Sequence, residues 1–171
     1  MQQIGHLGLS SSFAALYMSE CYNLPLELNY FSTGLMLFAA IIGGKLPDYD
    51  LLLGKETDTW RERVKYHRQF THSILLWILL SIGAYSASFS ISPLFVFAFF
   101  ICIGGISHLV GDILTGTVPI FFWANVRKKQ FRLGIYNQNL KNVFIYLGEF
   151  LGIPLFFGSI LLIANIFLTI F

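Results

Sequence analysis

Five apolar segments alternate with polar segments along the chain. They cover about residues 4–22, 30–44, 73–91, 93–115 and 143–171. A helix that crosses a bilayer needs about 20 mostly apolar residues, and the second segment is shorter than that. The pattern predicts an all-α fold, a polytopic transmembrane bundle of about five helices (four to five). We expect these helices to form a single integral membrane domain over residues 1–171.

The composition is that of a membrane protein. Of the 171 residues, 56% are hydrophobic and 12% are charged, whereas charged residues make up about 25% of a typical soluble domain. The mean hydropathy of +0.68 agrees with this. This composition argues against an ordinary cytosolic globule and excludes a disordered chain. From this composition we expect the lipid bilayer as a partner. The net charge of only +2 is too small to suggest nucleic acid.

The basic residues predict the orientation of the helices. All eleven Lys and Arg residues lie in two polar connections, Lys45–His72 and Asn125–Asn142. Connections rich in Lys and Arg stay in the cytoplasm, and five helices place these two connections on one side of the membrane. We therefore expect a multi-pass protein with its N-terminus in the cytoplasm and its C-terminus outside it.

Potential metal ligands come from four separate stretches, all at the predicted cytoplasmic ends of the helices. His108 and Asp112 are four residues apart, so their side chains share one helix face. Asp48 and Asp50 point the same way if their segment is extended. The full set is His6, Asp48, Asp50, His67, His72, His108 and Asp112. Since three or four nitrogen or oxygen ligands satisfy one ion, the set predicts a site for one or two divalent cations, Zn²⁺ or Mn²⁺.

Each part of this set also has a simpler interpretation. His108 and Asp112 could only hydrogen-bond each other at the membrane interface. The two Asp residues near position 48 could form a polar helix exit, and the loop histidines could be solvated. His6 could be an ordinary interfacial residue. A metal site is favoured because all these interpretations would have to hold at once, and ionisable groups in or near the bilayer are costly.

Two further residues have chemistry suited to a hydrolase. Arg68 lies between the two loop histidines, where its guanidinium could clamp a phosphate or simply anchor the loop in the cytoplasm. Glu149 could be a metal ligand, a partner of a ligand, a general base, or a carboxylate paired with a basic loop residue. The catalytic candidates are Asp48, Asp50, Arg68 and Glu149. The choice of general base among the three carboxylates stays open.

Three motifs give the chain a family resemblance. They are LPDYD at Leu46–Asp50, HRQFTHS at His67–Ser73 and SHLVGDILT at Ser107–Thr115. Their order and spacing resemble those of LexA-regulated, membrane-bound metal-dependent hydrolases of the YdjM type, in which a leading His also precedes them, as His6 does here. The resemblance covers about residues 1–124. It implies a bacterial inner-membrane hydrolase that uses the seven residues above as metal ligands.

Chemistry and resemblance together predict hydrolysis of a phosphoester. A divalent cation would activate water near neutral pH, and the cation or Arg68 would stabilise charge on a phosphoryl oxygen. Because the site would face the cytoplasmic leaflet, we expect a phosphoester lipid or a lipid-linked substrate. The family is also distantly similar to zinc-dependent phospholipases C.

Two other functions stay open. One is a non-enzymatic membrane subunit whose metal site is structural, which would be closed by four protein ligands. The less favoured one is a metal-ion transporter, which would need ligands near the middle of the bilayer.

Overall fold

The computed structural model describes residues 3–20, 30–51, 70–121, 132–134 and 137–170. They form five α-helices: α1 (Gln3–Glu20), α2 (Tyr30–Gly43), α4 (Ile74–Ser90), α5 (Phe95–Thr115) and α6 (Gln138–Ile170). Two 3₁₀ helices, η1 (Leu46–Leu51) and η2 (Phe70–His72), and two strands, β1 (Thr117–Pro119) and β2 (Arg132–Gly134), complete the described part. The predicted all-α class is confirmed, apart from the strand pair.

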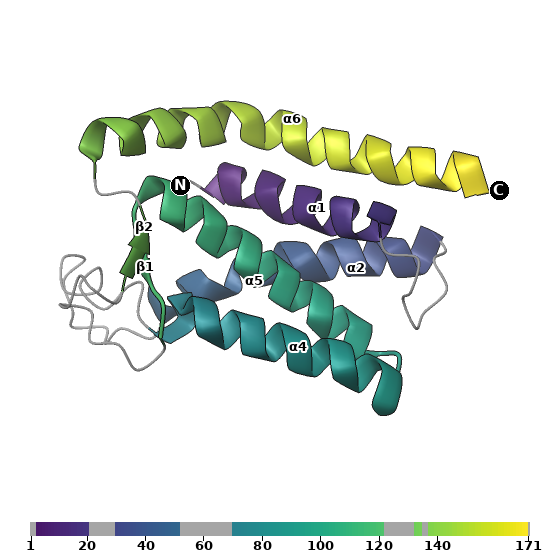
Figure 1. The fold of residues 1–171 in the computed structure, drawn as a ribbon. Coiled ribbons are helices and arrows are strands. Elements are labelled where there is room, and N and C mark those ends of the chain that lie inside the picture. Colours follow the sequence, from purple (N-terminus) through teal and green to yellow (C-terminus); the bar gives the residue numbers. More distant parts are fainter. Residues whose placement is uncertain (1–2, 21–29, 52–69, 122–131, 135–136, 171) are drawn as a thin grey trace.

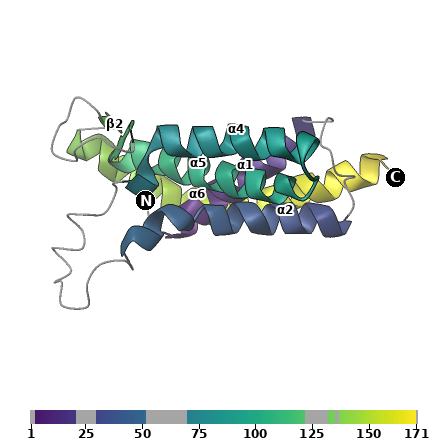
Figure 2. The same cartoon turned by 90° about the horizontal axis from the view of Figure 1, so that it is seen from below.

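The five α-helices lie side by side and alternate in direction along the chain (Figures 1 and 2). α1, α4 and α6 begin at the end of the bundle where the N-terminus lies, and α2 and α5 end there. The same end carries η1, η2 and the strand pair, and is referred to below as the N-end. The C-terminus lies at the opposite end (Figure 1).

The helix α5 is central and contacts α1, α2, α4 and α6. Its Phe99 and Phe100 are buried in a cluster with side chains of α1 and α2, which include Ala14, Met18 and Met36. Two glycines allow the backbones of α2 and α5 to approach. A Cβ on Gly104 would lie 1.9 Å from the carbonyl oxygen of Ala40, and one on Gly43 would lie 1.9 Å from that of Ile101. Close crossing of apolar helices depends on such small residues.

One described helix, α5, is long and apolar enough to cross a bilayer by itself. α6 would be a second if its parts Gln138–Gly148 and Phe150–Leu162, bent by 43°, form one span. The bend lies one turn before Pro154, whose ring clashes with the carbonyl group four residues earlier.

The other apolar helices are shorter than a full crossing. α2 has 14 residues and α4 has 17, which correspond to about 21 Å and about 26 Å of helix. The hydrocarbon core of a bilayer is about 30 Å thick. The predicted bundle of about five membrane-spanning helices therefore stays a prediction.

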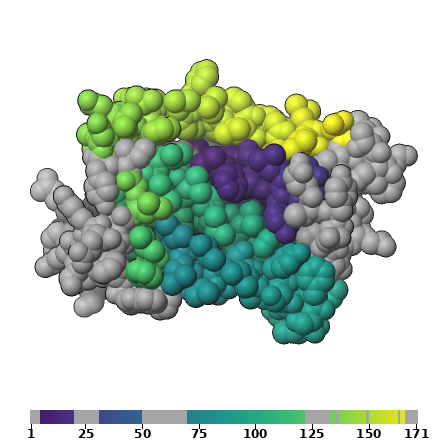
Figure 3. Space-filling model, viewed as in Figure 1, coloured from purple at the N-terminus to yellow at the C-terminus, as the bar shows by residue number. Residues whose placement is uncertain are grey.

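The outer surface of the bundle carries many large apolar side chains. Those of Phe38 on α2, Ile82 on α4 and Phe150 on α6 are all exposed. Figure 3 shows one face of the molecule, with α6 and α4 along opposite edges and α1 and α5 between them. An exposed apolar surface that extends over several helices is typical of a protein that contacts lipid or another protein.

The short antiparallel strand pair at the N-end was not predicted. Thr117 pairs with Gly134, Val118 with Leu133 and Pro119 with Arg132. Gly134 has a φ of +146°, which other residues rarely adopt, and a Cβ there would lie 2.0 Å from the carbonyl oxygen of Gly116. Strands of three residues are too short to show the alternating pattern that identifies a strand in a sequence.

Candidate metal centre

Five of the predicted ligands lie together at the N-end of the bundle. His6 is in the first turns of α1, and Asp48 is in η1, directly after α2. His72 ends η2, and its neighbour Ser73 is the N-cap of α4. His108 and Asp112 lie in the last two turns of α5. The cluster, consisting of His6, Asp48, His72, His108 and Asp112, therefore joins four elements that are distant in the sequence.

Two imidazoles each lie between two carboxylates. The Nε2 atom of His72 is 3.4 Å from Oδ2 of Asp112 and 3.6 Å from Oδ1 of Asp48. The Nε2 atom of His108 is 3.4 Å and 3.5 Å from the same two oxygens. A tetrahedral site with metal–ligand bonds of about 2.1 Å has edges of about 3.4 Å. Each of these four nitrogen–oxygen distances is therefore close to the length of an edge of such a site.

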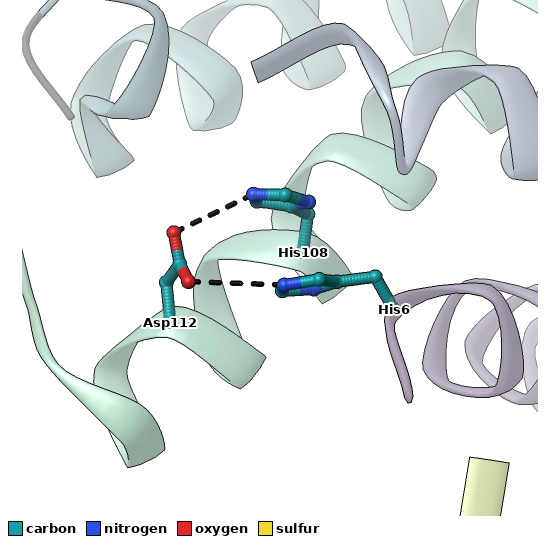
Figure 4. Close-up of side chains that lie close together, drawn as sticks. All are labelled: His6, His108 and Asp112. Carbon is teal, nitrogen blue, oxygen red and sulfur yellow. Dashed lines mark ion pairs between the residues drawn. The ribbon is translucent and has the colours of Figure 1, made fainter. Parts of the chain in front are cut away.

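His6 occupies the other side of Asp112. Its ring stacks on that of His108, with 3.8 Å between the centroids and 13° between the planes. Its Nε2 atom lies 3.8 Å from Oδ1 of Asp112 (Figure 4). The two oxygens of Asp112 thus face different imidazoles, as Figure 4 shows for His6 and His108. The ligand atoms of His6, His108 and Asp112 form one group close enough for an ion, and those of Asp48, His72 and His108 form another.

The cluster is buried except at Asp48. The side chains of His72, His108, Asp112 and His6 are 0%, 1%, 2% and 7% exposed, respectively. That of Asp48 is 39% exposed. Carboxylates and imidazoles that are so deeply buried need partners, because an isolated buried charge is strongly unfavourable. Among these five residues, Asp48 gives the cluster its contact with the exterior.

A backbone carbonyl determines which nitrogen of His108 faces the cluster. Nδ1 of His108 lies 2.7 Å from the carbonyl oxygen of Gly44. A carbonyl oxygen can only accept a hydrogen bond, so Nδ1 carries the hydrogen and Nε2 of the neutral ring has a lone pair. This Nε2 is buried and has no hydrogen-bond partner among the described residues.

The donor set fits a bound cation. In the neutral ring, the lone pair of His108 Nε2 faces carboxylate oxygens of Asp48 and Asp112, which are also acceptors. Acceptors that face one another repel unless a proton or a metal cation lies between them. Imidazole nitrogen and carboxylate oxygen are ligands of Zn²⁺ and of other divalent transition metals. The buried cluster could therefore hold a metal ion.

Serines and a glycine fix the helices around the cluster. The hydroxyl of Ser10 donates to the carbonyl oxygen of His6 at 2.8 Å. Ser107, next to His108, has its Oγ 2.8 Å from that of Ser10. A Cβ on Gly44 would lie 2.1 Å from Oγ of Ser10. α1, α5 and the end of α2 therefore meet at small residues that lie next to the ligands or one turn from them.

Four other predicted site residues lie wholly or by their side chains outside the described part of the chain. His67 and Arg68 lie outside the described residues. Asp50 belongs to η1 and Glu149 to α6, but their side chains are outside the described part. Their roles as ligands or catalytic groups stay predictions.

Sequence reasoning missed two groups that hold the imidazoles in place. One is the carbonyl of Gly44, which contacts His108. The other is the hydroxyl of Thr71, which lies 3.2 Å from Nδ1 of His72. A backbone carbonyl gives no signal in a sequence. The sequence did contain a signal for Thr71, because this residue directly precedes His72 in the HRQFTHS motif.

Comparison with known proteins identifies the family of the chain. The family model described as YdjM inner membrane protein matches residues 1–171. No curated protein and no solved structure matches the chain significantly. The family match includes all five residues of the cluster.

Proposed function

Because the chain belongs to the YdjM family of inner membrane proteins, we propose that it is a membrane-embedded metal-dependent hydrolase. Its cofactor would be one or two divalent cations, Zn²⁺ or Mn²⁺. Its substrate would be a phosphoester lipid or a lipid-linked phosphoester in the cytoplasmic leaflet. The protein would be multi-pass, with a cytoplasmic N-terminus and an extracytoplasmic C-terminus.

The observation that carries this proposal is the convergence of three imidazoles and two carboxylates at one end of the bundle. His72 and His108 would hold a cation through Nε2, and Asp48 would hold it through a carboxylate oxygen, so that three protein ligands leave a fourth position for water or substrate. Asp112 belongs to the neighbouring group, with His6 and His108. A divalent cation bound there would act as a Lewis acid that makes water more acidic and stabilises charge on a phosphoryl oxygen.

The exposure of Asp48 favours a catalytic site over a structural one. Structural metal sites are closed by protein ligands, whereas catalytic sites keep a position for water or substrate. Asp48 is 39% exposed, while His72 and His108 are buried. A substrate would reach the cluster from the side of Asp48, and the buried histidines would keep bulk water from the other sides. Asp48, Asp50 and Glu149 remain the candidates for general base.

The surface of the bundle supports a lipid substrate. Exposed Tyr49 and Phe70 lie on η1 and η2, the two elements that carry Asp48 and His72. Aromatic side chains at the ends of membrane helices favour the interface between lipid and water. A phosphoester headgroup in that interface would lie at the level of these two aromatics.

The first test is the metal content of the detergent-purified protein, measured by inductively coupled plasma mass spectrometry. We expect at least one equivalent of Zn²⁺ or Mn²⁺ in the wild type after metal supply. The double variant His72→Ala, His108→Ala should contain none. A wild type that binds neither metal would refute the proposal.

A second measurement separates a hydrolase from a structural metal site. Asp48→Asn removes the charge of the exposed ligand and keeps its shape. In a hydrolase it should abolish release of phosphate or headgroup from phosphoester lipids and leave the melting temperature almost unchanged. If the wild type releases no product from a panel of such lipids, and Asp48→Asn unfolds easily, the site is structural.

A further inference from the structure

The hydroxyl of Thr71 links two elements of the cluster. Its Oγ1 donates a hydrogen bond to the carbonyl oxygen of Pro47 at 2.9 Å. The same Oγ1 lies 3.2 Å from Nδ1 of His72. Thr71 and His72 belong to η2, whereas Pro47 directly precedes Asp48 in η1. One hydroxyl group thus connects the segment of one ligand to the ring of another.

These two contacts determine the tautomer of His72. A hydroxyl group has a single hydrogen, and the carbonyl of Pro47, which can only accept, takes it. The contact with His72 is then made by Nδ1–H, which donates to a lone pair of Oγ1. The opposite assignment would leave one of the two contacts without a hydrogen. The neutral ring therefore carries its hydrogen on Nδ1 and a lone pair on Nε2.

The lone pair on Nε2 is the one that faces the carboxylates. Nε2 of His72 lies 3.4 Å from Asp112 and 3.6 Å from Asp48. We propose that Thr71 is a positioning residue, whose hydroxyl fixes the tautomer and orientation of His72 and ties them to the segment that carries Asp48. This inference rests on the proposed function, because it gives Thr71 the role of an outer partner of a metal ligand.

Thr71 is itself anchored to the bundle. The indole Nε1–H of Trp77 on α4 donates to the carbonyl oxygen of Thr71 at 2.6 Å. The Trp77 ring packs on Gly105 of α5, where a Cβ would lie 2.4 Å from the ring. The position of the hydroxyl is therefore set by two long helices as well as by η2. Such preorganisation makes an outer-sphere hydrogen bond effective in metal binding.

Zinc affinity tests the role of the hydroxyl. Thr71→Val removes the hydroxyl and keeps the shape of the side chain, and Thr71→Ser keeps the hydroxyl. Zn²⁺ affinity of the detergent-purified protein would be measured by competition with a chromophoric chelator. We expect Thr71→Val to weaken binding about 10- to 100-fold, the usual effect of losing an outer partner, and Thr71→Ser to restore it. Thr33→Val is the matched control, because Thr33 is a buried threonine on α2 whose hydroxyl has no hydrogen-bond partner among the described residues.

The tautomer can be observed directly without metal. In metal-free protein labelled with ¹⁵N-histidine, the nitrogen chemical shifts at alkaline pH distinguish Nδ1–H from Nε2–H rings. His72→Gln identifies the signals of His72. We expect the Nδ1–H form in the wild type and in Thr71→Ser, and a shift toward the Nε2–H form in Thr71→Val. A merely structural role of Thr71 would not change this ratio.

The outcomes separate this inference from the proposed function. A folded Thr71→Val protein with wild-type zinc affinity would overturn the inference, as would an Nε2–H form of His72 in the wild type. If Thr71→Val does not fold, the wild-type tautomer still decides. If the wild type binds no metal, the proposed function fails, and with it the metal-related role of Thr71.

Discussion

Asp112 is the residue that contacts the most imidazoles of the cluster. Its Oδ2 lies 3.4 Å from both His72 and His108, and its Oδ1 lies 3.8 Å from His6. Its side chain is buried, so solvent screens its charge little. A carboxylate in this position attracts a cation more strongly than an exposed one does. The affinity of the site for metal should therefore depend on Asp112.

Asp112→Asn tests this dependence. The substitution keeps the shape of the side chain and removes its charge. We expect zinc affinity to fall by more than about 100-fold. Losing an outer partner of a ligand weakens binding by about 10- to 100-fold, and losing the charge of a ligand should weaken it more. Zinc at 100 times the wild-type dissociation constant should stabilise the wild type by about 2.7 kcal/mol and Asp112→Asn by no more than about 0.4 kcal/mol. Thermal unfolding in detergent, with and without Zn²⁺, measures both. Equal stabilisation of the two proteins would contradict the prediction.

At this scale the sequence predicts the ligand types better than their geometry. The spacing of His108 and Asp112 places both on one helix face, and the structure has them there. The nitrogen that each imidazole presents could not be predicted. It depends on Gly44 and Thr71, whose positions are set by how α2 and η2 meet the end of α5.

The packing of α5 against α2 positions His108. Gly104 lies one turn before His108, and its backbone approaches that of Ala40 so closely that no side chain fits. Oγ of Ser107 also lies 2.7 Å from the carbonyl oxygen of Gly104. Because the two helices meet without side chains between them, any added atom must push them apart. The separation would then reach Gly44, which holds His108.

Gly104→Ala should therefore destabilise the protein and weaken metal binding. Forcing one methyl group into a well-packed contact costs about 1–3 kcal/mol. Gly83→Ala on α4 is the matched control, because a Cβ there meets nothing within 4 Å, and alanine favours a helix more than glycine does. Thermal unfolding and zinc affinity of both variants are the measurements. Equal behaviour of the two would show that α2 and α5 can separate freely.

The elements differ in how well their sequences identify them. α4 and α5 follow from long, mostly apolar segments, and the structure has helices at Ile74–Ser90 and Phe95–Thr115. The strand pair could not be predicted, because it depends on Gly134 and on its pairing with β1. Nor could the lengths of the helices settle how many of them cross the membrane. α2 ends after 14 residues, where the chain turns into η1 and brings Asp48 to the cluster.

Across the described part of the molecule, the candidate metal ligands gather at one end of the bundle. The described ligands, the N-terminus and the starts of α1, α4 and α6 are all at the N-end, while the C-terminus is at the opposite end (Figure 1). The two connections that hold all eleven basic residues join helix ends at the N-end. Basic connections stay in the cytoplasm. If the bundle crosses the inner membrane five times, the candidate metal centre faces the cytoplasm.

Reporter fusions test this orientation. Green fluorescent protein fluoresces only when it folds in the cytoplasm, and alkaline phosphatase is active only outside it. We expect phosphatase activity from fusions after Ser92 and after Phe171, and fluorescence from fusions after Lys129 and at the N-terminus. The Ser92 and Lys129 fusions are internal controls, since they end on either side of α5, the helix with the length and apolarity of a span. A fluorescent, phosphatase-inactive C-terminus would mean an even number of crossings, because the N-terminus and C-terminus would then share one side. In that case α6 would lie on the membrane or turn back within it, and only the helices before it would determine which side the metal centre faces.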